Sequence, residues 1–150
     1  MMAESPQRTT GSATEPFELR IAVEPEDIDQ LGHVSNVVYL RWVQDAAVAH
    51  WRVTAPVLEQ ERLHWVVTRY EIDYRRPALA SDEIVARTWV GTASRRAFDR
   101  YTELVRASDG KMLARARTVW CPIDAVSGKA TDVSAEVRAR FSVPEPPPDP

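Results

Sequence analysis

Five separate stretches of the chain are predicted to be β-strands, and apolar and polar residues alternate along the first, the second and the last of them. The stretches are residues 17–23, 66–74, 84–90, 97–107 and 112–120. Pro77 ends the second stretch, and Asp109-Gly110 is a strong hairpin signal before the last. Residues 94–96 give a weaker turn signal between the third stretch and the fourth. We therefore expect one early strand and then four antiparallel strands.

A long apolar arc without glycine or proline occupies residues 36–52 and predicts a helix. Its polar residues form only a narrow stripe, so most of the helix surface is expected to be buried. Residues 24–32 form an acidic loop, residues 56–63 a linker, and residues 134–141 a short closing helix. The simplest packing is an α+β fold, in which an antiparallel sheet of about five strands wraps around one long buried helix.

Proline marks the ends of the predicted domain. Seven of the 11 prolines fall in the first sixteen or the last seven residues, and every aromatic residue lies between Phe17 and Phe141. Polar, proline-rich ends bury too little apolar surface to offset the entropy of ordering. We expect a single domain at residues 17–142, with disordered tails at 1–16 and 143–150.

Composition narrows the class of protein. A net charge of −3 and no basic tract argue against a nucleic-acid-binding protein. No apolar run reaches 18 residues, which argues against membrane insertion. Cys121 is the single cysteine, and it suits a reducing, cytoplasmic location. The three histidines are scattered, so we expect neither a metal site nor a cofactor.

The most informative segment is residues 27–39, which place two acids and a glycine just before a helix start. Ser35 or Asn36 is a plausible N-cap. The unpaired amides of the first helical turn concentrate positive potential where an oxyanion could develop. A carboxylate just upstream could attack a carbonyl there, or direct water at it. The same residue types are also ordinary turn and capping residues, and spacing alone leaves both interpretations open.

The pattern D-x-D-x-x-G-H-V-x-N-x-x-Y, together with Tyr74-Arg75-Arg76-Pro77 and the Asp109-Gly110 hairpin, resembles the hotdog-fold acyl-CoA thioesterases. The closest type is the 4-hydroxybenzoyl-CoA thioesterase and YbgC-like branch. The resemblance implies that Asp29 is the catalytic carboxylate, acting as nucleophile or general base. It also implies that the backbone amide near Asn36 polarises the thioester carbonyl and that Gly32 gives the chain room to turn.

The same resemblance implies a coenzyme A groove between subunits, and thus a homodimer or homotetramer. Ser94, Arg95 and Arg96 are the predicted contacts to the nucleotide phosphates, with Arg75 and Arg76 as weaker candidates. These arginines could equally be solvated charges at strand ends. His33 is interpreted as a hydrogen-bonding residue beside the substrate.

Several aromatic residues bear on the acyl group and on assembly. Tyr39, Trp42, Trp65 and Trp89 could line the acyl pocket or simply fill the core. Trp65, Trp89 and Trp120 exceed what a monomer should leave exposed, which predicts at least a dimer. The expected function is hydrolysis of an acyl-CoA to the free acid and coenzyme A. The alternatives are an acyl-carrier-protein thioesterase and a non-catalytic acyl-CoA-binding module.

Overall fold

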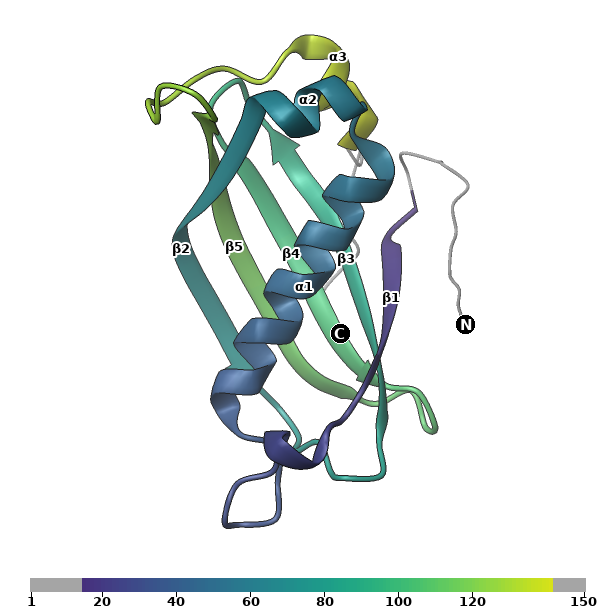
Figure 1. Ribbon diagram of the computed structural model, residues 1–150. Coiled ribbons are helices and arrows are strands. Elements are labelled where there is room, and N and C mark those ends of the chain that lie inside the picture. The colour runs from purple at the N-terminus through teal and green to yellow at the C-terminus, as the bar shows by residue number, and fades with distance from the viewer. Residues whose placement is uncertain (1–14, 142–150) are drawn as a thin grey trace.

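One antiparallel sheet curves around a single long helix in the computed structural model, which describes residues 15–141 (Figure 1). The helix is α1 (Asn36–Thr54), and the sheet has five strands in the order β1-β3-β4-β5-β2. The strands are β1 (Phe17–Ala22), β2 (Leu63–Tyr74), β3 (Glu83–Ala93), β4 (Phe98–Arg106) and β5 (Met112–Asp124). The predicted architecture is confirmed. The two predicted tails lie outside the described residues, apart from positions 15 and 16.

Helix α1 is held by its apolar arc, as its sequence predicted. Trp42 and Val43 are almost fully buried, and Ala46 is completely buried against the strands. The small side chain of Ala46 lets the sheet approach the helix axis closely. Beyond it, Ala47 joins a second apolar cluster with residues of β4, β5 and the closing helix α3 (Ala135–Phe141).

The segment between α1 and β2 differs from the prediction. Residues 56–63 were expected to be a linker, but they contain a short helix, α2 (Val57–Arg62). Pro56 occupies the N-cap position of α2, since its fixed φ angle suits a helix start. The Gln60 side-chain amide donates to the carbonyls of Ala55 (2.8 Å) and Arg52 (3.0 Å), which ties α2 to the end of α1. Strand β2 then begins at Leu63, three residues earlier than the alternation indicated.

A β-bulge at Thr68 divides β2 into two halves, and the alternation of inward and outward side chains shifts by one residue between them. Val67 pairs with Trp120 of β5, but the next pair is Arg69 with Val119, so Thr68 has no cross-strand partner. Trp65 and Val67 therefore pack toward the core before the bulge, and Ile72 does so after it. Simple alternation had placed Val66 on the same face as Ile72; instead Val66 is 41% exposed.

The tryptophans that predicted an oligomer are inside the protomer. Trp89 is fully buried, Trp120 is 7% exposed and Trp65 is half-buried. That argument for a dimer was wrong, because it assumed that one small core could not enclose these side chains. Trp42 and Trp89 fill the core and line neither of the two cavities described below.

Within the described part of the chain, no helix is both long and apolar enough to cross a bilayer.

Candidate active site

Residues 28–34 form a tight loop that closes just before α1 (Figure 1). Ile28 and Val34 pair as an isolated antiparallel bridge, and the Asp29 N–H donates to the His33 carbonyl at 2.8 Å. Gly32 turns the chain with a φ of +83°, a conformation that L side chains rarely adopt. The role predicted for Gly32 in the turn is thus matched by its backbone.

The loop fixes the Asp29 carboxylate through one of its two oxygens. Oδ1 accepts hydrogen bonds from the N–H groups of Leu31 (2.9 Å) and His33 (3.4 Å). Oδ2 has no hydrogen-bond partner among the described residues, and the Asp29 side chain is exposed. One oxygen is therefore held by the backbone while the other is free to act on a bound group.

Asp27, the first acid of the pair, has a structural role. It is 1% exposed, pairs with Arg41 at 2.9 Å and accepts the Glu24 N–H at 2.9 Å. Burial alone raises the pKa of Asp27, but the Glu24 hydrogen bond and the Arg41 ion pair outweigh it and hold that pKa below its usual value. The structure thus separates two acids that sequence spacing presented together.

The N-terminus of α1 faces the same loop. Ser35 is the N-cap, although its side chain makes no capping hydrogen bond, and Asn36 is the first helical residue. The Val38 N–H donates to the Ser35 carbonyl at 2.9 Å, while the Asn36 and Val37 amides have no intrahelical acceptor by their position. These two amides could bind an oxyanion.

Tyr39 connects the helix to the end of β2. Its hydroxyl accepts the Ala78 N–H at 2.7 Å and donates to the Arg76 carbonyl at 3.2 Å. The Ala78 carbonyl in turn accepts the Val34 N–H at 2.9 Å, at the end of the Asp29 loop. Burial raises the Tyr39 pKa above its usual value, so the phenol stays neutral and able to donate. Tyr39 therefore positions the Asp29 loop through these hydrogen bonds.

A shallow groove of about 520 Å³ runs along this surface. It brings together much of the predicted site: Asp29, His33, Asn36, Tyr39, Arg75 and Arg76. Arg75 and Arg76, which line this groove, are the residues that the sequence analysis gave as weaker candidates for contacts to the coenzyme A phosphates.

The predicted phosphate contacts Ser94, Arg95 and Arg96 lie elsewhere in the protomer. They form the β3–β4 turn, at the opposite end of the sheet from the Asp29 loop (Figure 1). Asp132 pairs with Arg96 at 2.7 Å and with Arg95 at 3.5 Å. Within one protomer the hairpin does not reach the groove, and its contact with substrate stays a prediction.

Sequence reasoning missed Arg100, which is 4% exposed on the helix-facing side of β4. The sequence carried a signal, because Arg100 lies two residues from Phe98 and from Thr102 and so shares their face of the strand, and both of those residues are buried. Over residues 15–141, no group of three or more His, Cys, Asp or Glu side chains is arranged to hold a metal ion.

Known proteins similar to this chain are thioesterases. A palmitoyl-acyl carrier protein thioesterase of Gossypium hirsutum is 25% identical over 75% of this chain, and an acyl-[acyl-carrier-protein] hydrolase of Cuphea viscosissima is 28% identical over 72% of it. The matches cover 29% and 23% of those proteins, so the chain spans less than a third of their length.

Solved structures share the fold. A Thermus thermophilus thioesterase, determined with coenzyme A and zinc, is 27% identical with a TM-score of 0.71, over 83% of this chain and 90% of its own. A predicted thioesterase of Bacillus stearothermophilus has a TM-score of 0.76 at 19% identity, over 88% of this chain and 99% of its own. These likenesses confirm the predicted hotdog fold; the finer branch stays a prediction.

The sequence profile of the thioesterase-like superfamily matches residues 23–141 of this chain, which includes the Asp29 loop, α1 and all strands except β1. The chain therefore belongs to the thioesterase-like superfamily.

Proposed function

We propose that this protein hydrolyses a thioester, with acyl-CoA as substrate and the free acid and coenzyme A as products. The observation that carries the proposal is the Asp29 loop, where one carboxylate oxygen is held and the other is free beside the N-terminus of α1. Membership of the thioesterase-like superfamily supports the reaction class.

In the proposed mechanism, the thioester carbonyl oxygen lies against the amides of Asn36 and Val37. These donors stabilise the negative charge that develops on the oxygen in the tetrahedral transition state. Asp29 Oδ2 either attacks the carbonyl carbon directly or removes a proton from an attacking water molecule. The C–S bond then breaks, and coenzyme A leaves with the bonding electron pair as a thiolate. If Asp29 attacked directly, water then hydrolyses the acyl-aspartyl anhydride to the free acid; if Asp29 acted as the base, its proton passes to the departing coenzyme A. Arg75 and Arg76, at the edge of the groove, are the nearest candidates for its phosphates.

A carrier-protein thioester is the second candidate substrate. Both curated relatives act on acyl-carrier-protein thioesters by name, whereas the Thermus thermophilus structure was solved with coenzyme A. The two substrates share the phosphopantetheine arm and the chemistry, and they differ in what lies at the groove mouth.

We also propose that the protein acts as a homodimer or larger assembly in the cytoplasm. β2 is an edge strand of 12 residues that exposes Val66 (41%), Tyr70 (37%) and Tyr74 (42%). A long edge with exposed apolar side chains favours pairing with a second chain. Sedimentation at micromolar concentration should give at least twice the 16.9 kDa mass, and a monomer would contradict the proposal.

The test of the reaction is thiol release from an acyl-CoA panel of varied chain length and aromatic groups, with matched acyl-carrier-protein substrates beside it. Asp29→Asn and Asp29→Ala should lower kcat by at least about a hundredfold while the fold is kept. Glu26→Gln is the matched control, because Glu26 is an exposed acid just before the loop. It should leave kcat unchanged.

The outcomes separate the candidates. Turnover of CoA thioesters that is lost with Asp29 supports the proposal, and a strong preference for carrier-protein thioesters moves it to the second candidate. Residual hydrolysis above a tenth of wild type in folded Asp29→Ala contradicts the role of Asp29. No turnover of either substrate class by folded wild type favours the non-catalytic binding module.

A further inference from the structure

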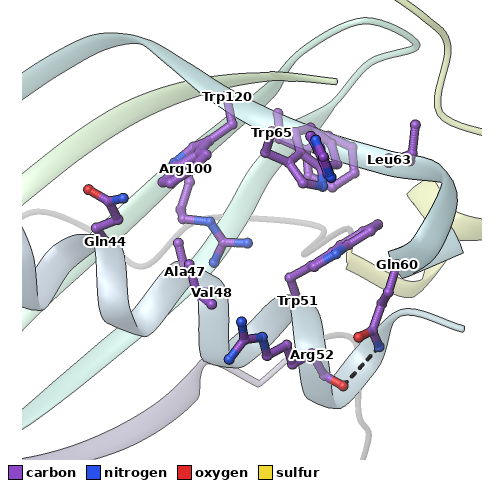
Figure 2. A pocket seen from close by; sticks show the side chains of 12 residues that line it. Gln44, Ala47, Val48, Trp51, Arg52, Gln60, Leu63, Trp65, Arg100 and Trp120 are labelled. Atoms are coloured by element: carbon purple, nitrogen blue, oxygen red, sulfur yellow. Dashed lines mark hydrogen bonds between the residues drawn. The ribbon is translucent and has the colours of Figure 1, made fainter. Parts of the chain in front are cut away.

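A second cavity, of about 360 Å³, lies along the C-terminal half of α1, between that helix, α2 and strands β2, β4 and β5 (Figure 2). Four aromatic side chains form much of its wall: Trp51, Trp65, Phe98 and Trp120. At 1.5 Å per residue, Ala47 in this wall lies about 16 Å along the helix from Asn36. A cavity of this volume accommodates a small organic ligand.

Arg100 reaches into this aromatic cavity from β4 (Figure 2). Its side chain is more than nine-tenths buried, since the residue is only 4% exposed. The Nη1 group donates to His50 Nδ1 at 3.0 Å and to Thr88 Oγ1 at 2.9 Å. Both hydrogens of Nη1 are therefore used, and they orient the guanidinium.

The partners of Arg100 carry no charge to balance it. Burial and the positive charge of Arg100 hold the His50 pKa well below its usual value, so His50 is a neutral acceptor. The His50 ring is itself fixed between Phe17, which stacks on it at a centroid distance of 5.1 Å, and Phe141 at 4.8 Å. This arrangement holds Arg100 in place without neutralising it.

The acidic residues of β4 are engaged by other arginines. Asp99 pairs with Arg117 at 2.8 Å, and Glu103 pairs with Arg87 at 3.5 Å. Among the described residues, no carboxylate lies within 4.0 Å of Arg100, and its Nε and Nη2 groups have no hydrogen-bond partner.

An unpaired buried charge is costly, and burial lowers the Arg100 pKa to about 9. Arg100 is still protonated at neutral pH. The cavity thus contains a fixed cation with unused hydrogen-bond donors. A bound anion would balance the charge and accept hydrogen bonds from those donors. The Trp65 indole N–H is a further buried donor without a partner in the described part of the chain, on a residue of the same wall.

We propose that this cavity binds a carboxylate carried on an apolar group, with the carboxylate on Arg100 and the apolar part against the tryptophans. Aromatic walls favour an apolar body over a phosphate or a sulfate ion, and the planar guanidinium fork matches a carboxylate. The inference rests on Arg100 and its surroundings and does not depend on thioester hydrolysis. The carboxylate could belong to a free acid or to the far end of an acyl group attached to coenzyme A.

Intrinsic fluorescence gives a direct binding assay, because three of the 5 tryptophans line the cavity. The full-length protein is titrated with phenylacetate and with phenylacetamide, which has the same shape but no charge. A second pair tests the other source: the non-hydrolysable thioethers S-(5-carboxypentyl)-CoA and S-hexyl-CoA. Because neither pair requires turnover, the result is independent of the proposed reaction.

In at least one pair, the carboxylate should bind about tenfold or more tightly than its neutral partner. Arg100→Met should abolish that preference while leaving the neutral ligand unaffected, and Arg100→Lys should keep part of it. Arg20→Gln removes an exposed charge on β1 and should change neither. Preference in the first pair identifies a free acid as the ligand, and preference in the second pair alone identifies the acyl end.

Equal binding of charged and neutral ligands in both pairs would overturn the proposal. So would a carboxylate preference that survives Arg100→Met in a folded protein. If Arg100→Met fails to fold, the wild-type preference and its partial loss in Arg100→Lys still decide the question.

Discussion

The hydroxyl of Tyr39 provides the sharpest stability prediction, because it joins three segments around the candidate site. It accepts the Ala78 N–H at 2.7 Å, and the Ala78 carbonyl accepts the Val34 N–H at 2.9 Å. Tyr39→Phe removes only the oxygen atom and leaves the ring packing as it was. The Ala78 N–H, on a fully buried residue, then loses its acceptor.

The expected cost follows from that buried amide. An unsatisfied buried donor lowers the free energy of unfolding by about 1–3 kcal/mol. The Arg76 carbonyl also loses its bond from Tyr39, but Arg76 is exposed, so water can replace the phenol there. Tyr74→Phe is the matched control: its hydroxyl donates to the Asn36 carbonyl at 3.2 Å from a residue that is 42% exposed. Water can replace that bond, so we expect a loss of about 0.5 kcal/mol or less.

Urea denaturation of both variants measures the difference. With a slope of about 2 kcal/mol/M, a loss of about 2 kcal/mol lowers the midpoint by about 1 M. Where wild type hydrolyses a thioester, Tyr39→Phe should also lower kcat by about tenfold to a hundredfold, because the Asp29 loop loses its anchor. Equal midpoints for Tyr39→Phe and Tyr74→Phe would refute the reasoning, since the buried amide would then carry no cost.

Three further predictions concern the loop and the sheet. Asp27→Asn should lower the unfolding free energy at pH 7 by about 1–3 kcal/mol, because it breaks an ion pair in which the carboxylate is buried and the Arg41 side chain is half exposed. The folded-state pKa of Asp27 is lowered, so its contribution to stability is present above the unfolded-state pKa and is lost as the pH falls through the folded-state pKa. The unfolding free energies of the variant and of wild type should therefore converge in acid. A constant difference between them from neutral pH down to strong acid would contradict this. Gly32→Ala, at a φ of +83°, should cost about 1 kcal/mol in denaturant unfolding, and an unchanged midpoint would show that the loop relaxes freely. Gly91→Ala would place a Cβ 2.7 Å from Tyr101 Cε2 and should lower stability by about 1–3 kcal/mol in calorimetry, whereas a neutral effect would mean that the Tyr101 ring can move aside.

Periodicity was sufficient for most of the fold. The apolar arc of α1 and the alternation of β5 depend on local patterns that burial imposes directly, so both could be predicted. Helix α2 was missed because its exposed surface carries no apolar period. The Thr68 bulge was missed because a bulge is set by pairing with β5, which the local sequence does not display.

The candidate site was predictable in its frame but not in its details. The spacing placed Asp29 beside the helix start, yet only the fold shows that Asp27 is paired with Arg41. Arginine is mostly exposed in folded proteins, so Arg100 was not considered as a site residue despite its inward position on β4. Alternation along β4 could have placed Arg100 inward, but only the fold shows that no carboxylate among the described residues faces it.

The Thr68 bulge has a consequence for comparing this chain with its relatives. In a relative whose second strand runs without a bulge, an ungapped alignment matches the two strands correctly on one side of Thr68 only. On the other side, every residue that contacts the core here is matched to one that faces outward there. Residues that line the aromatic cavity, such as Trp65, lie on one side of that point, and Tyr74 of the Asp29 groove lies on the other. Specificity residues can therefore be transferred between such proteins only after a one-residue gap is placed at Thr68.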